Sequence, residues 1–382
     1  MSSLRETVRR GCVFAGLAVL AACSSWHQVE RHDGWTLYSE KGSAVDTGAF
    51  RTAFDPAHRT VEEYFGPFRS DVRVHALPNE GEADESIQGT GIVHEVPGIG
   101  RARVRAYHAR GDGFFGPASG IYAVSPDAGT AAHELVHARL AEEAPDLPLW
   151  FEEGLACVIG DGVLDGERWI VDGYACWPVR ELREQRLTDT ELAHVLQVGE
   201  EESTSVRDNV LVHFVGWAIV FDLYRESGAF DWRAWQKRYG AKIDLAEARR
   251  RLERSTSTDV ESEWLKRLSS PDRSVRLATA KGVWKLRSSE AITALLDALD
   301  REEDGELKVS FAVNTLAAAG EMKIGWELQD RLWRTVWPVL KRCKLDDVLE
   351  QSSLKNLLQS FRWRSNVSSQ QALEGLRRFW AE

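Results

Sequence analysis

Apolar and polar positions in the first third of the chain follow the periods of strands and helices. Residues 35–38 carry aromatic and β-branched side chains, and residues 71–77 alternate in character, so both segments are predicted to be strands. Between them, residues 46–65 repeat apolar side chains at helical spacing. A further strand is expected at 120–124, followed by a helix that begins near Pro126. This order of strands and helices predicts an α+β domain.

The later part of the chain is patterned as helices. Residues 207–227 predict a strongly apolar helix, and 230–239 and 245–254 continue the helical period. A polar run at 255–259 interrupts the pattern, and we place a domain boundary near it. The expected organisation is therefore an α+β domain over 35–258, followed by an all-α domain over 262–382.

The N-terminus carries a pattern unlike that of a folded element. A short basic region precedes an uncharged apolar run at 12–22, too short to cross about 30 Å of hydrocarbon but typical of a signal peptide. The run ends in Leu-Ala-Ala-Cys23, which resembles the lipobox of bacterial lipoproteins. That resemblance implies removal of residues 1–22, acylation of Cys23, a polar tether at 23–34 and, with Ser24 next, an outer-membrane anchor facing the periplasm. An ordinary signal peptide with a coincidental cysteine is the alternative.

Composition and charge exclude several classes of protein. The 382 residues exceed one typical domain, and 43% hydrophobic with 28% charged residues excludes a disordered chain or a multi-span membrane protein. The formal net charge is -11, and it becomes -13 without residues 1–22, which carry three Arg and one Glu. An acidic surface repels phosphate, so nucleic acid is not expected as a partner.

The expected helix after Pro126 contains His133-Glu134-Leu-Val-His137. Residues four apart lie one above the other on a helix, so both imidazoles can reach one zinc ion. Glu134 lies beside the first histidine and can act as general base on metal-bound water. A surface helix with unrelated histidines is the alternative, but the apolar residues between and after the histidines favour a helix that packs.

A second helical segment follows, Pro148-Leu-Trp-Phe-Glu-Glu153-Gly154-Leu-Ala, in which fifteen residues separate His137 from Glu153. The two segments together resemble the gluzincin metallopeptidases, in particular the compact bacterial peptidase-MA-like group. The resemblance covers roughly residues 33–240, and it implies a zincin-like fold and hydrolysis of peptide bonds by zinc-activated water.

The resemblance also assigns roles to single residues. It implies that Zn²⁺ binds to His133, His137 and Glu153, with Glu134 as the catalytic base. Glu152 is then expected to point away, either solvated or in contact with a ligand. Gly154 is expected to let the two helices approach closely.

Other residues of the peptidase region stay open. An oxyanion-stabilising side chain is expected, and its candidates are Tyr174, His194, His213 and Tyr224. For His213, inside an apolar helix, the favoured interpretation is a packed core histidine. The strand at 120–124 is expected at the sheet edge, where it would pair with a peptide substrate, and an interior strand without that role is the alternative. The remaining histidines have no partner at metal-ligand spacing and are expected to be solvated or packed: His27, His32, His58, His75, His94 and His108.

Cysteine spacing leaves two alternatives. Once the signal peptide and the acylated Cys23 are set aside, Cys157, Cys176 and Cys343 remain in an oxidising compartment. Cys157 and Cys176 either form a disulfide or, with Cys343, remain buried thiols.

Two C-terminal segments are self-similar. Residues 272–280 align with 304–312 at an offset of 32, with an amphipathic segment at 289–299 between them. The Asp-x-x-Val-Arg start and the Ala-x-x-Leu-Leu-x-Ala-Leu segment resemble HEAT repeats, which implies stacked helical pairs with a protein-binding surface over 262–382. An unrelated helical bundle is the alternative.

The sequence thus predicts a lipid-anchored zinc metallopeptidase of the bacterial envelope with a helical-repeat tail. A non-catalytic envelope scaffold, whose repeats bind protein partners, competes with it, as does a metal hydrolase acting on non-peptide bonds. The presence of Glu134 favours chemistry over a scaffold. The natural substrate, endo- or exopeptidase action and the oligomeric state remain open.

Overall fold

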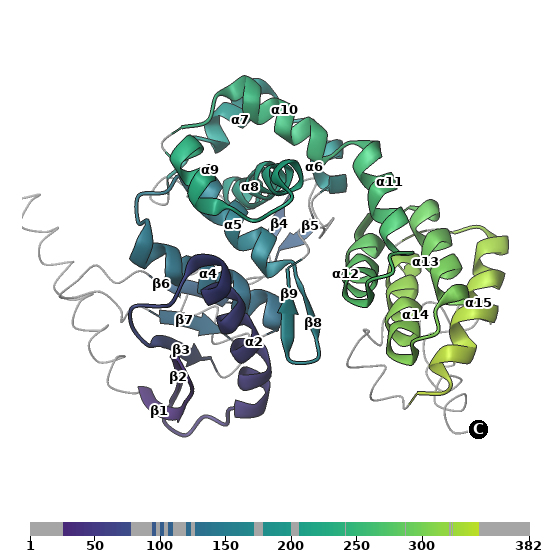
Figure 1. Ribbon diagram of the computed structural model, residues 1–382, viewed down its shortest axis with the longest axis horizontal. Coiled ribbons are helices and arrows are strands. Elements are labelled where there is room, and N and C mark those ends of the chain that lie inside the picture. The colour runs from purple at the N-terminus through teal and green to yellow at the C-terminus, as the bar shows by residue number, and fades with distance from the viewer. Residues whose placement is uncertain are drawn as a thin grey trace, which may run out of the picture. The chain divides into compact units, whose positions relative to one another are not determined.

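Figure 1 shows the computed structural model, in which the described part of the chain is mostly helical with a small mixed sheet. It contains thirteen α-helices, against nine short strands. The described residues are 26–77, 94–96, 100–102, 106–109, 120–123, 127–171, 179–199, 206–240, 242–286, 288–320, 322 and 324–343. The expected signal peptide and Cys23 lie outside them.

The chain divides into two compact units. Unit 1 comprises Met1–Gly160, Gly166–Val171 and Leu187–Arg249, and unit 2 comprises Asp161–Asp165, Asp172–Arg186 and Arg250–Glu382. Unit 2 thus takes up two short segments from the middle of the chain in addition to the C-terminal helices.

Unit 1 contains a five-stranded sheet in the order β1-β2-β3-β7-β6. The strands are β1 (Trp26–Arg31), β2 (Trp35–Glu40), β3 (Val72–Ala76), β6 (Ala106–Ala109) and β7 (Gly120–Ala123). The three central strands β2, β3 and β7 run parallel, and β1 and β6 pair antiparallel at the two edges. Strands are confirmed within the expected segments 35–38, 71–77 and 120–124, of which residue 124 lies outside the described part of the chain.

The expectation that residues 120–124 form a sheet edge is wrong. β7 lies between β3 and β6 and uses both of its sides for pairing. A strand with two neighbours has no free N–H and C=O row to offer a peptide. At the opposite edge, residues expected in the tether form β1, which pairs with β2 from Trp26 to Arg31.

Two helices next to the sheet hold the core of unit 1. They are α2 (Thr47–Phe65), which includes Pro56, and α4 (Ala128–Glu143). α4 begins at Ala128, where the Asp127 carboxylate accepts hydrogen bonds from the backbone N–H and the hydroxyl of Thr130, both at 2.9 Å. This cap satisfies a free first-turn donor and fixes the start of the helix. Fully buried side chains fill the core: Trp35, Leu37, Phe54, Val61, Val74 and Leu135.

The remaining helices of unit 1 follow α4 in the chain. They are α5 (Leu149–Gly160), α7 (Asp189–Val195), α8 (Val206–Ser227) and α9 (Trp232–Tyr239), while α10 (Leu245–Ser255) runs across the division between the units. α8 is apolar around most of its circumference, and it is correspondingly buried. No described helix combines the length and apolar character that crossing a membrane requires.

Unit 2 consists chiefly of α-helices. These are α6 (Val179–Gln185), α11 (Thr258–Arg267), α12 (Arg273–Val283), α13 (Ser289–Arg301), α14 (Gly305–Gly320) and α15 (Trp326–Leu340), with a short 3-10 turn at Trp284–Leu286. Short strands elsewhere are β4 (His94–Val96), β5 (Gly100–Ala102), β8 (Val163–Asp165) and β9 (Arg168–Ile170).

The self-similar segments of unit 2 begin in the same way. The Asp272 carboxylate accepts from the backbone N–H groups two and three residues on, and Asp304 does the same at the start of α14. Arg273 links the two starts, because its Nε donates to Asp304 at 2.9 Å. An equivalent cap at an offset of 32 therefore accompanies the repeat in sequence.

The buried carboxylate of Glu302 makes the stability of unit 2 depend on pH in the acid range. Glu302 is 9% exposed and accepts from Arg276 at 2.8 and 3.2 Å and from the backbone N–H groups of Glu303 and Asp304. Burial alone would raise the pKa of Glu302, but the Arg276 guanidinium and these N–H groups hold it below the ordinary 4.5. Its contribution to stability is therefore complete above pH 4.5 and is lost as the pH falls through the lowered pKa.

We expect Glu302→Gln to lower the free energy of unfolding by about 1–3 kcal/mol at neutral pH, because hydrogen bonds to a charged acceptor are lost. The deficit should shrink as the pH falls through the acid range, since the wild-type carboxylate is then protonated too. Thermal melting of the full chain across that range measures both effects. Glu303→Gln, at an exposed neighbour, is the matched control, and an equal deficit at neutral and acid pH would contradict the expectation.

Candidate metal centre

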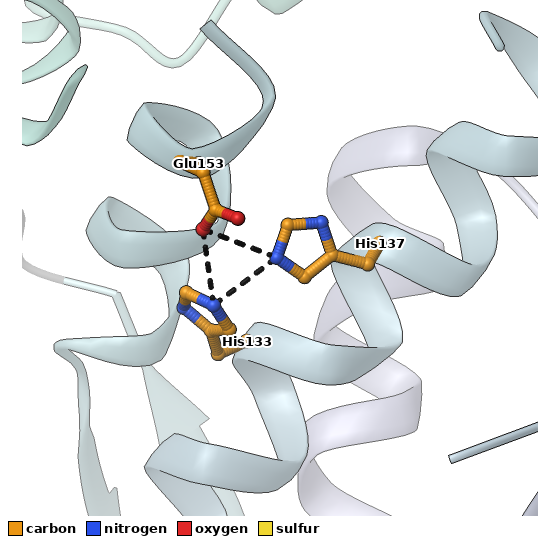
Figure 2. A group of neighbouring side chains, drawn as sticks. All are labelled: His133, His137 and Glu153. Atoms are coloured by element: carbon orange, nitrogen blue, oxygen red, sulfur yellow. Dashed lines mark hydrogen bonds and ion pairs between the residues drawn. The ribbon is translucent and has the colours of Figure 1, made fainter. Parts of the chain in front are cut away.

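Two neighbouring helices carry the candidate ligands. His133 and His137 lie one turn apart on α4, and Glu153 lies in the first half of α5, which begins after Pro148. Figure 2 shows the two imidazoles and the carboxylate pointing toward one another from these two helices. Among the described residues, they form the one group of three whose possible ligand atoms all lie within 4.8 Å of each other.

The three ligand atoms form a nearly equilateral triangle. The two Nε2 atoms are 3.1 Å apart, and Oε2 of Glu153 lies 3.4 Å from Nε2 of His133 and 3.3 Å from Nε2 of His137. Tetrahedral ligands at bond lengths of about 2.0–2.1 Å, as for zinc, lie about 3.3–3.4 Å from one another. The residues therefore have the spacing of three corners of such a site.

The chemistry of the donors also suits a cation. Nδ1 of His137 lies 2.8 Å from Oε1 of Glu152 and donates to that carboxylate, which leaves Nε2 as the nitrogen that can bind a cation at the centre of the triangle. Oε2 of Glu153 is buried and receives no hydrogen bond of good geometry from the described residues. Buried acceptor atoms that face one another repel unless a proton or a metal ion lies between them.

Glu152 contacts one of the candidate ligands. The sequence left it as either solvated or in contact with a ligand, and the structure shows the contact: Glu152 is 2% exposed and holds His137. A carboxylate on the far nitrogen of a ligating histidine fixes the tautomer and the direction of the ring.

Charges in the triangle balance one another. Burial raises the pKa of Glu153, but His213 and His137 outweigh it and hold the pKa well below its usual range. Burial lowers the pKa of His137, whereas Glu153 and Glu152 raise it well above the usual value. The carboxylates thus favour positive charge at this place, whether on protonated imidazole or on a bound cation.

Glu134 lies next to the candidate ligands, and its carboxylate makes no hydrogen bond or ion pair with the described residues. The residue is 6% exposed. Burial raises its pKa, and the neighbouring His133 and His137 act against that increase. Such a carboxylate is available to a water molecule at the site.

His213, interpreted from the sequence as a packed core histidine, lies on α8 beside the candidate ligands and is only partly buried. Its Nε2 lies 2.9 Å from Oε2 of Glu153, and its ring lies parallel to that of His133, with centroids 5.6 Å apart. The side chain is 24% exposed. The available signal was weak: a lone histidine in an apolar helix, one turn before Gly216.

Two glycines allow α5 and α8 to cross in contact. A Cβ on Gly216 would lie 2.1 Å from the Trp150 carbonyl oxygen, and a Cβ on Gly154 would lie 2.4 Å from the Gly216 carbonyl oxygen. The close approach expected of Gly154 therefore occurs, but with α8 rather than with α4. Since Glu153 precedes one glycine and His213 lies a turn before the other, the crossing places these two side chains together.

Among the other described candidates, His194 lies outside the group of candidate ligands. His194 on α7 is 57% exposed and lies 3.4 Å from Asp208, while Tyr174 and Cys176 lie outside the described residues. Tyr224 lies on α8 near its C-terminal end, half-buried. The pairing of Cys157, which is buried, with Cys176 therefore stays a prediction.

None of the six remaining histidines belongs to the group of candidate ligands found among the described residues. His58 and His75 are buried, and burial lowers the pKa of His75 to about 4. His27 lies exposed on β1, and the ring of His32 stacks on that of Trp35, with ring centroids 4.0 Å apart. His94 and His108 belong to β4 and β6.

Comparison with known proteins gave no match: no family model fits this sequence, and no curated protein or solved structure is significantly similar to it. Inference about its function therefore starts from the residues and geometry of the site.

Proposed function

We propose that this chain is a zinc-dependent metallopeptidase of the gluzincin type, with a zincin-like fold in unit 1. The observation that carries the proposal is the triangle of acceptor atoms from His133, His137 and Glu153. Beside it lies the carboxylate of Glu134, which makes no hydrogen bond or ion pair with the described residues. A scaffold that used zinc only for structure would need the triangle and would have no use for Glu134.

Each residue has a chemical role in this proposal. Bound zinc would lower the pKa of a water molecule and polarise the carbonyl group of the scissile peptide. His133, His137 and Glu153 hold the metal, and Glu152 keeps the His137 ring in its ligating orientation. Glu134 accepts the proton of the attacking water and passes it to the leaving amine.

The proposed location is the bacterial envelope. The motif that ends at Cys23 supports a lipid anchor, most simply on the outer membrane and facing the periplasm. The substrate is then a peptide or protein of that compartment. The acidic net charge of -11 gives no support to a nucleic-acid partner.

For unit 2 we propose a HEAT-like repeat region that binds a protein partner. The equivalent caps of Asp272 and Asp304, 32 positions apart, support a repeated helical unit. Helical repeats present extended surfaces of this kind to other proteins.

Zinc content and peptide cleavage by the purified full chain test the peptidase proposal together. We expect about one zinc ion per chain, cleavage of a fluorogenic peptide library, loss of cleavage on chelation and its return with added zinc. A chain that binds zinc but cleaves no peptide would support the scaffold alternative, and a chain that binds no metal would refute the site itself.

A further inference from the structure

His213 lies at the candidate site, yet the proposed chemistry assigns it no role. Its Nε2 approaches Oε2 of Glu153 to 2.9 Å, closer than His133 or His137, whose Nε2 atoms lie 3.4 and 3.3 Å from the same oxygen. His213 therefore makes the shortest of these three contacts with the oxygen expected to bind the metal.

The position of the His213 ring is fixed from several sides. Nδ1 lies 2.8 Å from the backbone carbonyl of Asn209 and Nε2 lies 2.9 Å from Oε2 of Glu153, and these two acceptors together require a proton on each ring nitrogen, so the ring forms an ion pair with Glu153. One face lies parallel to the ring of His133, at an interplanar angle of 4°. The contact of Gly154 with Gly216 fixes the backbone one turn away. A side chain held in these three ways has little freedom to leave Glu153.

The geometry favours contact with a ligand over direct ligation. His213 lies outside the group of three whose ligand atoms are all within 4.8 Å of one another. A carboxylate oxygen has two lone pairs, so Oε2 can bind a metal ion with one and contact His213 with the other. A free glutamate side chain has several rotamers, and holding it in one orientation lowers the entropic cost of metal binding.

We infer that His213 is a positioning residue that holds the Glu153 carboxylate in its metal-ligating orientation. The inference rests on the metal site of the proposed function. A residue of α8, distant in sequence from the ligand motif, then increases the affinity of the site for the metal. Loss of a group that orients a ligand typically weakens metal binding by about 10- to 100-fold.

The test measures zinc affinity in the full chain with His213→Ala and His213→Gln. Competition with a chromophoric chelator gives the dissociation constant, and the visible spectrum of the cobalt-substituted protein reports the number and kind of ligands. We expect His213→Ala to weaken zinc binding about 10- to 100-fold without loss of a nitrogen ligand in the cobalt spectrum. His213→Gln, with an amide that can contact the same oxygen, should regain much of the affinity.

His194→Ala is the matched control, because this exposed histidine on α7 contacts Asp208 and not the site. Unchanged zinc affinity in His213→Ala would overturn the inference. So would loss of a nitrogen ligand in the cobalt spectrum, which would make His213 a ligand, or unchanged affinity with a lower kcat, which would place it on the substrate. Wild-type protein that binds zinc but cleaves no peptide would refute the proposed peptidase and leave this comparison of affinities valid.

Discussion

Replacing Glu134 with glutamine is expected to abolish peptide hydrolysis while zinc stays bound. The change keeps the size of the side chain and touches none of the atoms of the His133, His137 and Glu153 triangle. An amide cannot accept the proton of the attacking water, so the general-base contribution of about 10²- to 10⁴-fold in rate is lost. The measurements are kcat/KM on a cleaved peptide and zinc content per chain.

Glu63→Gln is the control for this substitution, because Glu63 is an exposed glutamate on α2. It should leave both rate and zinc content unchanged. Full activity of Glu134→Gln would remove Glu134 from the mechanism. Loss of zinc together with activity would show that Glu134 supports the metal site rather than the chemistry.

Replacing Gly216 with alanine is expected to disrupt the fold of unit 1 and the site with it. The new Cβ would lie 2.1 Å from the Trp150 carbonyl oxygen and 2.9 Å from the Gly154 nitrogen, and both are backbone atoms that cannot turn aside. The helices α5 and α8 must then separate, at a cost of about 3 kcal/mol in the free energy of unfolding. Separation also moves Glu153 away from His213, so zinc affinity should fall in the fraction that folds.

Chemical denaturation of the full chain measures the first effect, and chelator competition measures the second. Gly199→Ala is the matched control in the same unit, because a Cβ there would meet no atom within 4 Å. If Gly216→Ala unfolds at the wild-type denaturant concentration, the close crossing of α5 and α8 is not a requirement of the fold.

Local patterns could be interpreted from the sequence because their geometry is set within a few residues. The spacing of His133 and His137 brings their Nε2 atoms to 3.1 Å simply because four residues make about one helical turn. The strand at 35–38 is likewise predicted from its aromatic and β-branched residues, and the strand at 71–77 from the alternation of its sequence. The pairing of Glu153 with this motif required the family resemblance, and the structure places its carboxylate beside both imidazoles.

Sheet order could not be predicted in the same way. The pattern of residues 120–124 is that of a strand with buried side chains, whether it has one neighbour or two. Pairing of β6 along β7 depends on a segment whose own pattern is short and weak. Alternation specifies which side chains lie on each face of a strand. Whether the strand lies at the edge or inside the sheet depends on which other segments pair with it.

The sequence by itself determined the ligand-bearing helix, the neighbouring strands and the acidic charge, because each depends on residue type and short-range spacing. Only the tertiary structure decided that Glu152 holds His137 and that His213 approaches Glu153. The second contact follows from two glycines on different helices that let two backbones meet. Such a meeting depends on the shape of both surfaces at once, and neither segment contains that information alone.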